Sequence, residues 1–257
     1  MPFPLSLPDV PNHVLLAAPL IVLLGYTIFG ATGFGSSIIS VPALAHFFPL
    51  AFTVPLITTT DAFAATATAF RLRRLVAWRE VARLLPAMLI GIALGATLLL
   101  KLPRNPALLA LGIFAAAYGT YIFVGPPRFA HAPGWLVWPV GLIGGVFSSL
   151  FGTGGPIYIV FLSARIDDKS TLRATSAIVV VAAVWIRLVL FIATGLLLDA
   201  KLLAMAAMLL PVMALGLWLG NHLHHALSRG GVLRLIAGLL MINGVALIVR
   251  AVESMHG

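Results

Sequence analysis

The stretch GATGFGSSIISVPAL, from Gly30 to Leu44, interrupts a chain that is otherwise strongly apolar. It brings three glycines and two adjacent serines into a run that is typical of a membrane helix. A second stretch, SSLFGTGGPIYIVFL from Ser148 to Leu162, has the same character. Backbone that leaves the helix at membrane depth is tolerated only where it is buried in protein or lines a cavity. The two breaks are therefore expected to be buried in the protein or to line a cavity.

The composition indicates a membrane protein. Of the 257 residues, 61% are hydrophobic and 9% are charged, whereas a soluble domain averages about 25% charged residues. Eight apolar runs approach the roughly 20 residues that a helix needs to cross a bilayer, and a shorter run follows each break. We predict an all-α polytopic membrane protein with about eight long and two short membrane segments. The long runs are Val14–Phe29, Ala51–Phe70, Leu84–Leu100, Ala107–Val124, Trp135–Phe151, Ala174–Leu198, Leu202–Leu219 and Leu235–Val249, and the short ones are Ser36–Phe48 and Thr153–Ala164.

Charge and motif content exclude several function classes. The formal charge of +9 comes mostly from loops between apolar runs, where Lys and Arg usually set the orientation of a membrane protein. The expected partner is therefore the lipid bilayer and not a nucleic acid. The chain has no cysteine, hence no thiolate site. His222, His224 and His225 lack a nearby carboxylate in sequence, so no metal and no other cofactor is expected.

The chain reads as two related halves. The glycine break at Gly33 recurs 119 positions later at Gly152, and PAMLIGIALG from Pro86 recurs as PVMALGLWLG from Pro211, 125 positions later. A run of hydroxyl side chains lies between these features in each half. Close helix packing alone explains pairs of small residues four apart. The same order of three separate features in both halves favours a duplication.

The loop charges decide between parallel and inverted halves. If eight helices cross the membrane and the short runs are left out, the loop Lys and Arg divide eight against seven between the two sides. If each glycine break is the tip of a hairpin, each half has three full crossings, the second half is inverted, and the division becomes eleven against four. Membrane proteins concentrate Lys and Arg on the cytoplasmic side. The division is the same if both short runs cross the membrane fully, so the charges do not separate these two arrangements. We therefore predict inverted repeats, with the Arg71–Arg83 loop cytoplasmic and both termini outside, whether the short runs cross or re-enter.

This organisation sets the domain boundaries. We predict an N-terminal tail over residues 1–12, a first membrane repeat over 13–124, a Pro/Gly-rich linker over 125–133 and a second membrane repeat over 134–257. Together the repeats form one integral membrane domain. The oligomeric state is not written in the sequence.

The breaks also predict where a ligand binds. Glycine accepts a positive φ and lets a ligand approach the backbone. The short helices begin at Ser36 and near Pro156, and proline suits the first turn of a helix. Free N–H groups and the helix dipole make such an end attractive to anions. Paired broken helices in two halves mark the substrate site of a transporter, so we expect two opposed anion-binding tips near the midplane of the membrane.

These motifs resemble the TauE/SafE sulfite exporter family. The resemblance is carried by GFGSSIISVPAL, by GTGGPIYIVFL and by RATSA from Arg173 to Ala177, and it covers nearly the whole chain. It implies a multi-pass transporter of the bacterial plasma (inner) membrane, similar to 4-toluene sulfonate uptake permeases, that exports or exchanges sulfite or organosulfonates such as sulfoacetate. Ser36 and Ser37 stand where the family usually has further glycines.

Two charged residues, Asp61 and Arg187, lie deep in apolar runs. A charge at the centre of a bilayer costs about 2.5 kcal/mol or more and is usually functional or paired. Arg187 could hold an oxyanion through two N–H groups, neutralise Asp61, or face lipid. Asp61 could carry a coupling proton, pair with Arg187, or bond to the threonines beside it.

Further polar residues complete the candidate substrate site. Hydroxyl groups in both halves could line the pathway or bond to their own helices, and Tyr158 could contact substrate or only pack. The candidate substrate-binding residues are Gly33, Phe34, Gly35, Ser36, Ser37, Thr59, Gly152, Thr153, Gly154, Gly155, Tyr158, Thr175, Ser176 and Arg187, and the proton-coupling candidate is Asp61.

Three function classes compete. The first is a secondary transporter of small anions that bind at the glycine breaks and are coupled to protons. The second is a passive anion channel, which would share the helix tips but needs no coupling residue. The third is an intramembrane hydrolase, which requires a membrane-embedded general base. Because the histidines lie at the ends of the apolar runs or in loops, we expect no enzyme.

Overall fold

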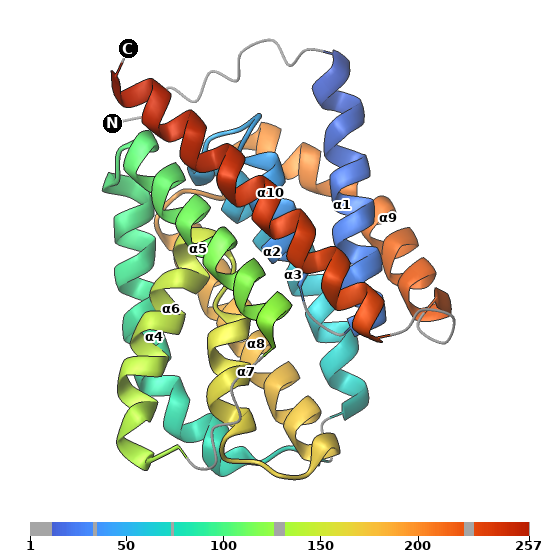
Figure 1. The fold of residues 1–257 in the computed structure, drawn as a ribbon, viewed down its shortest axis with the longest axis vertical. Helices are drawn as coiled ribbons and strands as arrows, with labels where there is room; N and C mark the ends of the chain where they lie inside the picture. Colours follow the sequence, from blue (N-terminus) through green and yellow to red (C-terminus); the bar gives the residue numbers. More distant parts are fainter. Residues whose placement is uncertain (1–11, 33–34, 73–74, 126–131, 224–228, 257) are drawn as a thin grey trace.

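The computed structural model describes residues 12–32, 35–72, 75–125, 132–223 and 229–256, and every regular element in these ranges is helical (Figure 1). The all-α architecture predicted from the composition is confirmed. The first half contains α1 (Asn12–Thr32), α2 (Ser36–Leu44), α3 (Leu50–Leu72), α4 (Trp78–Lys101) and α5 (Arg104–Val124); the second contains a 3₁₀ turn, η2 (Gly134–Leu136), and α6 (Val137–Phe151), α7 (Gly155–Ser163), α8 (Lys169–Ala193), α9 (Ala200–Leu223) and α10 (Arg229–His256).

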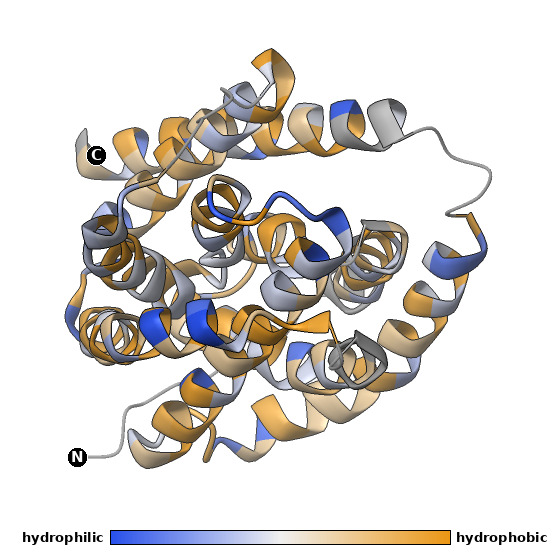
Figure 2. Ribbon diagram, turned by 90° about the horizontal axis from the view of Figure 1, so that it is seen from below, coloured by the Kyte–Doolittle hydropathy of each residue, from blue (hydrophilic) through white to orange (hydrophobic). Residues whose placement is uncertain are grey.

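The helices have the length and surface of membrane spans. Within the described ranges seven helical segments are long and apolar enough to cross a membrane, while α1 contributes the shorter apolar segment Ala17–Ala31. Hydrophobic residues dominate along the helices (Figure 2), and many large apolar side chains face outward. A soluble monomer rarely exposes so much contiguous apolar surface. The protein is therefore a multi-pass integral membrane protein.

Two predicted runs extend several residues beyond their helices, and one of them is Ser36–Phe48, because α2 ends at Leu44. The apolar run from Ala174 was expected to continue to Leu198, whereas α8 ends at Ala193. The chain turns there through Gly195, which has a φ of 80°. The residues after the turn are apolar but no longer helical, so hydrophobicity alone could not locate this end.

Each short helix turns back alongside the helix before it. Ser40 of α2 lies beside Gly25 of α1, and the ring of Tyr158 of α7 lies against Gly144 of α6. A methyl group on either glycine would overlap its neighbour, so α1 with α2 and α6 with α7 form tightly packed hairpins. Gly35 and Gly152 lie where these hairpins turn, and whether the short helices cross or re-enter the membrane stays a prediction.

Contacts at the two ends of the molecule agree with the hairpins. Arg165, which follows α7, forms two hydrogen bonds with the Glu80 carboxylate at the start of α4 (2.6 and 3.0 Å) and donates to the carbonyl of Ala132 (2.9 Å). The end of α7 therefore lies beside the α3–α4 connection. At the other end Arg250 of α10 donates to the carbonyl of His46, which follows α2. The start of α1 and the end of α10 also lie at one common end of the molecule (Figure 1).

The two halves contact each other in a reciprocal pattern. Helix α4 packs extensively on α6, and its counterpart α9 packs on α1. The central helices α3 and α8 pair with each other, as do α5 and α10. Exchanging the two halves leaves this list of main pairings unchanged, which supports a duplication. The inverted orientation of the halves in the membrane stays a prediction.

The glycine pairs matched between the halves lie at these contacts. Gly91 and Gly95 of α4 face the backbone of α6, and Gly216 and Gly220 of α9 face the backbone of α1. A methyl group on any of the four would overlap the facing helix. Small residues allow membrane helices to approach closely. These glycines therefore attach each half to the broken helix of the other half.

Candidate functional site

Both breaks turn at a glycine in the left-handed region. Gly35, with a φ of 106°, directly precedes α2, and Gly152, with a φ of 72°, follows the last residue of α6. Other residues lose about 1–2 kcal/mol in this conformation, so the turns themselves require glycine here. Helix α2 begins at Ser36, as expected, and α7 begins at Gly155 with Pro156 in its first turn. Gly33 and Phe34 lie outside the described residues.

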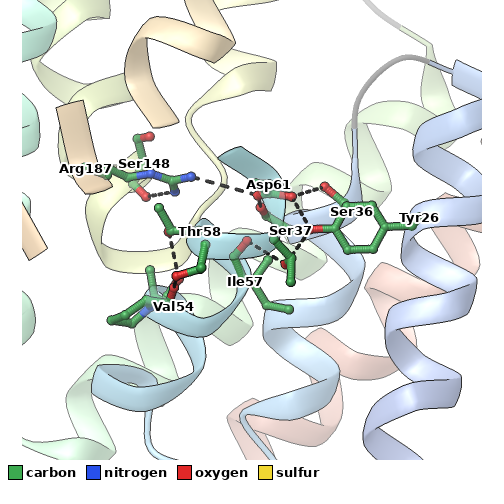
Figure 3. A network of polar contacts seen from close by, with 12 residues as sticks. Tyr26, Ser36, Ser37, Val54, Ile57, Thr58, Asp61, Ser148 and Arg187 are labelled. Carbon is green, nitrogen blue, oxygen red and sulfur yellow. Dashed lines mark hydrogen bonds and ion pairs between the residues drawn. The ribbon is translucent and has the colours of Figure 1, made fainter. Parts of the chain in front are cut away.

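The carboxylate of Asp61 on α3 is the centre of a buried polar network (Figure 3). Its Oδ1 accepts hydrogen bonds from the hydroxyls of Tyr26 and Ser36, both at 2.7 Å, and its Oδ2 accepts one from Ser37. Hydrogen bonds to a charged acceptor are about twice as strong as neutral ones. Ser36 and Ser37 are also the first two residues of α2, whose dipole favours a negative charge at this end.

Arg187 on α8 lies opposite Asp61 and is only 2% exposed. Its Nη2 is 4.0 Å from Asp61 Oδ2, and its Nη1 donates to the carbonyl of Ser148 on α6. Its buried Nε has no hydrogen-bond partner among the described residues. A buried donor without a partner is costly, and more so when it carries charge. The guanidinium is thus loosely paired with Asp61 and has a donor to spare.

A small cavity, called the tip cavity below, lies between the two breaks. Its volume is about 40 Å³, and a single water needs at least about 10–15 Å³ by the same measure. The cavity therefore has room for a few waters or for one small ion. The polar residues and glycines in its wall are Gly35, Ser36, Ser37, Asp61, Ser148, Gly152, Gly155 and Arg187.

Seven residues that the sequence singled out meet at the tip cavity, four from the first half and three from the second. Two of the remaining candidates bond elsewhere. Thr59 donates to the carbonyl of Pro55 in its own helix at 2.9 Å. Thr175 accepts from the N–H of Ala77, just before α4, at 2.9 Å. The first bond lies within α3 and the second joins α8 to the segment before α4. Neither residue lines the tip cavity.

The last four described candidates also lie away from the wall of the tip cavity. Thr153, Tyr158 and Ser176 are buried, and their hydroxyls have no hydrogen-bond partner among the described residues. Gly154 packs closely against Gly144 and Ser148 of α6. A role in substrate binding for these four residues stays a prediction.

Sequence reasoning missed two members of the site. Tyr26 is fully buried and supplies a hydroxyl to Asp61, and the same hydroxyl lies 2.7 Å from Thr60 Oγ1. Ser148 contributes its carbonyl to Arg187. A tyrosine in the middle of the apolar segment LLGYTIFG was a usable signal, since a buried phenol usually needs a partner. The carbonyl of Ser148 gave no signal because every residue has one.

Comparison with known proteins identifies the family of the chain. A family model described as sulfite exporter TauE/SafE matches residues 17–247, which include both breaks and both buried charges. The probable inner membrane transporter protein TsaS of Comamonas testosteroni is 29% identical over 175 residues, which cover 68% of this chain and 73% of that protein. No solved structure matches the chain significantly. The resemblance seen in the glycine motifs is thereby confirmed: the chain is a membrane transporter and belongs to the sulfite exporter TauE/SafE family.

Proposed function

We propose that the protein is a secondary transporter of small oxyanions, either sulfite or an organosulfonate such as sulfoacetate, which bind in the tip cavity. The observation that carries the proposal is the spare donor of Arg187, buried at a cavity that is also lined by the first residues of α2. A guanidinium presents its N–H groups in a planar fork that suits oxyanions. The free N–H groups at the start of a helix favour the same charge.

The size of the tip cavity supports a small anion. Its volume is about 40 Å³, which is room for roughly three waters by the minimum volume that one water needs. Three waters occupy a space comparable to that of one sulfite ion. A larger organosulfonate requires the two tips to separate. Ser37 and Gly152 already touch across the cavity, so passage of any substrate requires movement of one hairpin relative to the other.

That contact favours a carrier over a passive channel. In a carrier the binding site opens to one side at a time, and a closed contact between the hairpins is one state of that cycle. Asp61 supplies the coupling proton in this proposal, because its carboxylate is buried and lines the same cavity. A channel would need neither the coupling residue nor the alternation.

Uptake of radiolabelled sulfite into proteoliposomes tests the proposal. Arg187→Lys keeps the charge but loses the fork, so uptake should fall by about ten-fold or more, equivalent to a loss of about 1.4 kcal/mol or more. Arg165→Lys is the matched control, since Arg165 pairs with Glu80 away from the cavity. Normal uptake by a folded Arg187→Lys protein, or uptake of neither sulfite nor sulfoacetate by the wild type, would contradict the proposal.

Exchange experiments separate the carrier from the channel. Unlabelled sulfite placed inside the vesicles should accelerate entry of labelled sulfite through a carrier, because the loaded site returns faster than the empty one. An inward proton gradient should also drive accumulation above the outside concentration. A channel would show neither effect and would only equilibrate sulfite with the membrane potential.

A further inference from the structure

The donors around Asp61 are those that an oxyanion would need. Three hydroxyls, from Tyr26, Ser36 and Ser37, point at its two oxygens, and Arg187 stands at 4.0 Å. Two of these hydroxyls belong to the first turn of α2, where an anion is expected to bind. All of these groups except Tyr26 line the tip cavity. The carboxylate itself thus occupies the position of a bound anion.

We infer that Asp61 is a tethered competitor of the transported anion. When it is ionised it engages the donors of the site, and the substrate binds only after Asp61 has taken up a proton. This inference rests on the proposed function and adds to it how the proton and the anion are linked. Proton and substrate are linked because the ionised carboxylate and the substrate cannot occupy the site at the same time.

The geometry does not allow both anions at once. The hydroxyls of Ser36 and Ser37 each have one proton to donate, and both are directed at the carboxylate. The Tyr26 hydroxyl lies 2.7 Å from both Asp61 Oδ1 and Thr60 Oγ1. Two negative charges a few ångströms apart in a site of low dielectric repel strongly, and such pairs of carboxylates share a proton for this reason. The tip cavity also offers only about 40 Å³, which leaves no room for a layer of water between the two charges.

Proton uptake balances the charge. In the empty site, Arg187 carries one positive charge and ionised Asp61 one negative charge. A proton from the open aqueous side binds to a carboxylate oxygen of Asp61, which becomes neutral, and the hydroxyls turn to the incoming anion. A singly charged anion beside Arg187 then restores the same net charge. One proton therefore accompanies one monovalent anion.

Few ionisable groups can replace Asp61 in this role. Those facing its carboxylate are Tyr26 of α1 and Arg187 of α8. Helices α2, α4, α5, α6 and α9 also pack against α3. Their described parts place no Lys, Arg, His, Asp or Glu in hydrogen-bond or ion-pair contact with Asp61. Protonation in the site is thus expected at Asp61.

The test measures sulfite binding to the purified wild type, to Asp61→Asn and to Thr58→Val by titration calorimetry at about pH 5 and about pH 8, both above the ordinary pKa of an aspartate. Asparagine cannot ionise, so the competitor is removed. Thr58→Val is the control, because this buried hydroxyl bonds only to the carbonyl of Val54 in its own helix. Sulfite itself titrates, but that contribution cancels in the ratio of two dissociation constants at one pH.

The ratio of the wild-type Kd to the Asp61→Asn Kd should rise by about ten-fold between the two pH values if the binding-competent fraction falls to about a tenth. Thr58→Val should follow the wild type. A constant ratio, or loss of sulfite binding in Asp61→Asn alone, would overturn the inference and leave the proposed function standing. Absence of both sulfite and sulfoacetate binding to the wild type at both pH values would instead refute the proposed function.

A second measurement does without Asp61→Asn, in case that variant does not fold. Infrared difference spectra recorded on adding sulfite should show a protonated carboxyl band appearing as a carboxylate band is lost. Sulfite binding without this exchange of bands would overturn the inference. Arg187→Lys, in which binding is weakened, should show a smaller change at the same sulfite concentration.

Discussion

Ser37 and Gly152, one on each glycine break, touch each other across the tip cavity. A methyl group on Gly152 would come within 2.9 Å of Ser37 Cβ and 3.4 Å of Arg187 Nη1. The hairpins of the two halves therefore meet at their tips, and the tip of the second cannot gain an atom unless they move apart. The contact places the buried cation, the start of α2 and the second break within one small volume.

We expect Gly152→Ala to destabilise the protein. The left-handed φ of 72° costs an alanine about 1–2 kcal/mol, and the overlap with Ser37 adds to this. Gly155→Ala is the matched variant, because its methyl group would meet only Val180 at 3.4 Å and its backbone is helical. Thermal unfolding in detergent should show a lowered Tm for Gly152→Ala and a nearly unchanged one for Gly155→Ala. Equal Tm values for the two variants would refute this account of the break.

Tyr26→Phe should destabilise the protein. The fully buried phenol lies 2.7 Å from the Asp61 carboxylate, and a hydrogen bond to a charged group contributes about 1.5–3 kcal/mol. Phenylalanine keeps the ring but removes this donor, so thermal unfolding in detergent should show a lowered Tm. Tyr118→Phe, on α5, is the control with the same chemical change away from Asp61. Equal Tm values for the two variants would show that the Tyr26 hydroxyl does not stabilise the polar network.

The Glu80–Arg165 pair should stabilise the end of the molecule where α4 begins and α7 ends. Arg165 bonds both carboxylate oxygens and the carbonyl of Ala132, and both side chains are less than a fifth exposed. Hydrogen bonds to charged groups contribute about 1.5–3 kcal/mol, so Glu80→Gln should lower the free energy of unfolding by about that amount. Arg83→Gln removes only an exposed partner of Glu80 and should cost under about 1 kcal/mol. Similar losses in both variants would contradict the importance of the Arg165 contact.

Stability should decrease as the pH falls below about 6.5, the ordinary pKa of histidine, partly through His46. Burial, together with the positive charge of Arg250, lowers the pKa of His46. The unfolded chain therefore binds the proton at a higher pH than the folded protein does, which favours unfolding as the pH falls toward the lowered pKa. In His46→Gln this part of the acid sensitivity should disappear, as measured by Tm between about pH 7 and pH 5. An unchanged slope in this variant would exclude His46 as a contributor.

The membrane class and the breaks could be predicted from the sequence because each follows from local or statistical chemistry. Apolar runs define spans and glycines mark the breaks, whereas the loop charges are divided in the same way whether the short helices cross or re-enter. The starts of α2 and α7 followed from Ser36 and Pro156. The end of α8 did not, since the residues after Ala193 are as apolar as those before it.

The contacts of the site were less predictable because the same side chains serve different purposes. Thr59 and Thr175 resemble pathway hydroxyls in sequence, but Thr59 bonds to a carbonyl of its own helix and Thr175 bonds to the backbone just before α4. The proximity of Asp61 and Arg187 could have been predicted from the spacing of the repeat. They stand 126 positions apart, close to the 125 that separate Pro86 from Pro211, and they lie on the paired helices α3 and α8. When two equivalent helices of the two halves pack on each other, residues at equivalent positions near their contact lie close together.

The packing of α9 on α1 has a consequence for biosynthesis. Gly30 of α1 lies against Gly220 of α9, yet the ribosome adds Gly220 only 190 residues later. At about 5–20 residues per second, α1 waits about 10–40 s for the helix that covers it. During this time its small-residue face is exposed to lipid or to the insertion machinery. The first half leaves the ribosome as an incomplete structure, and the emergence of α9 near the end of translation completes it.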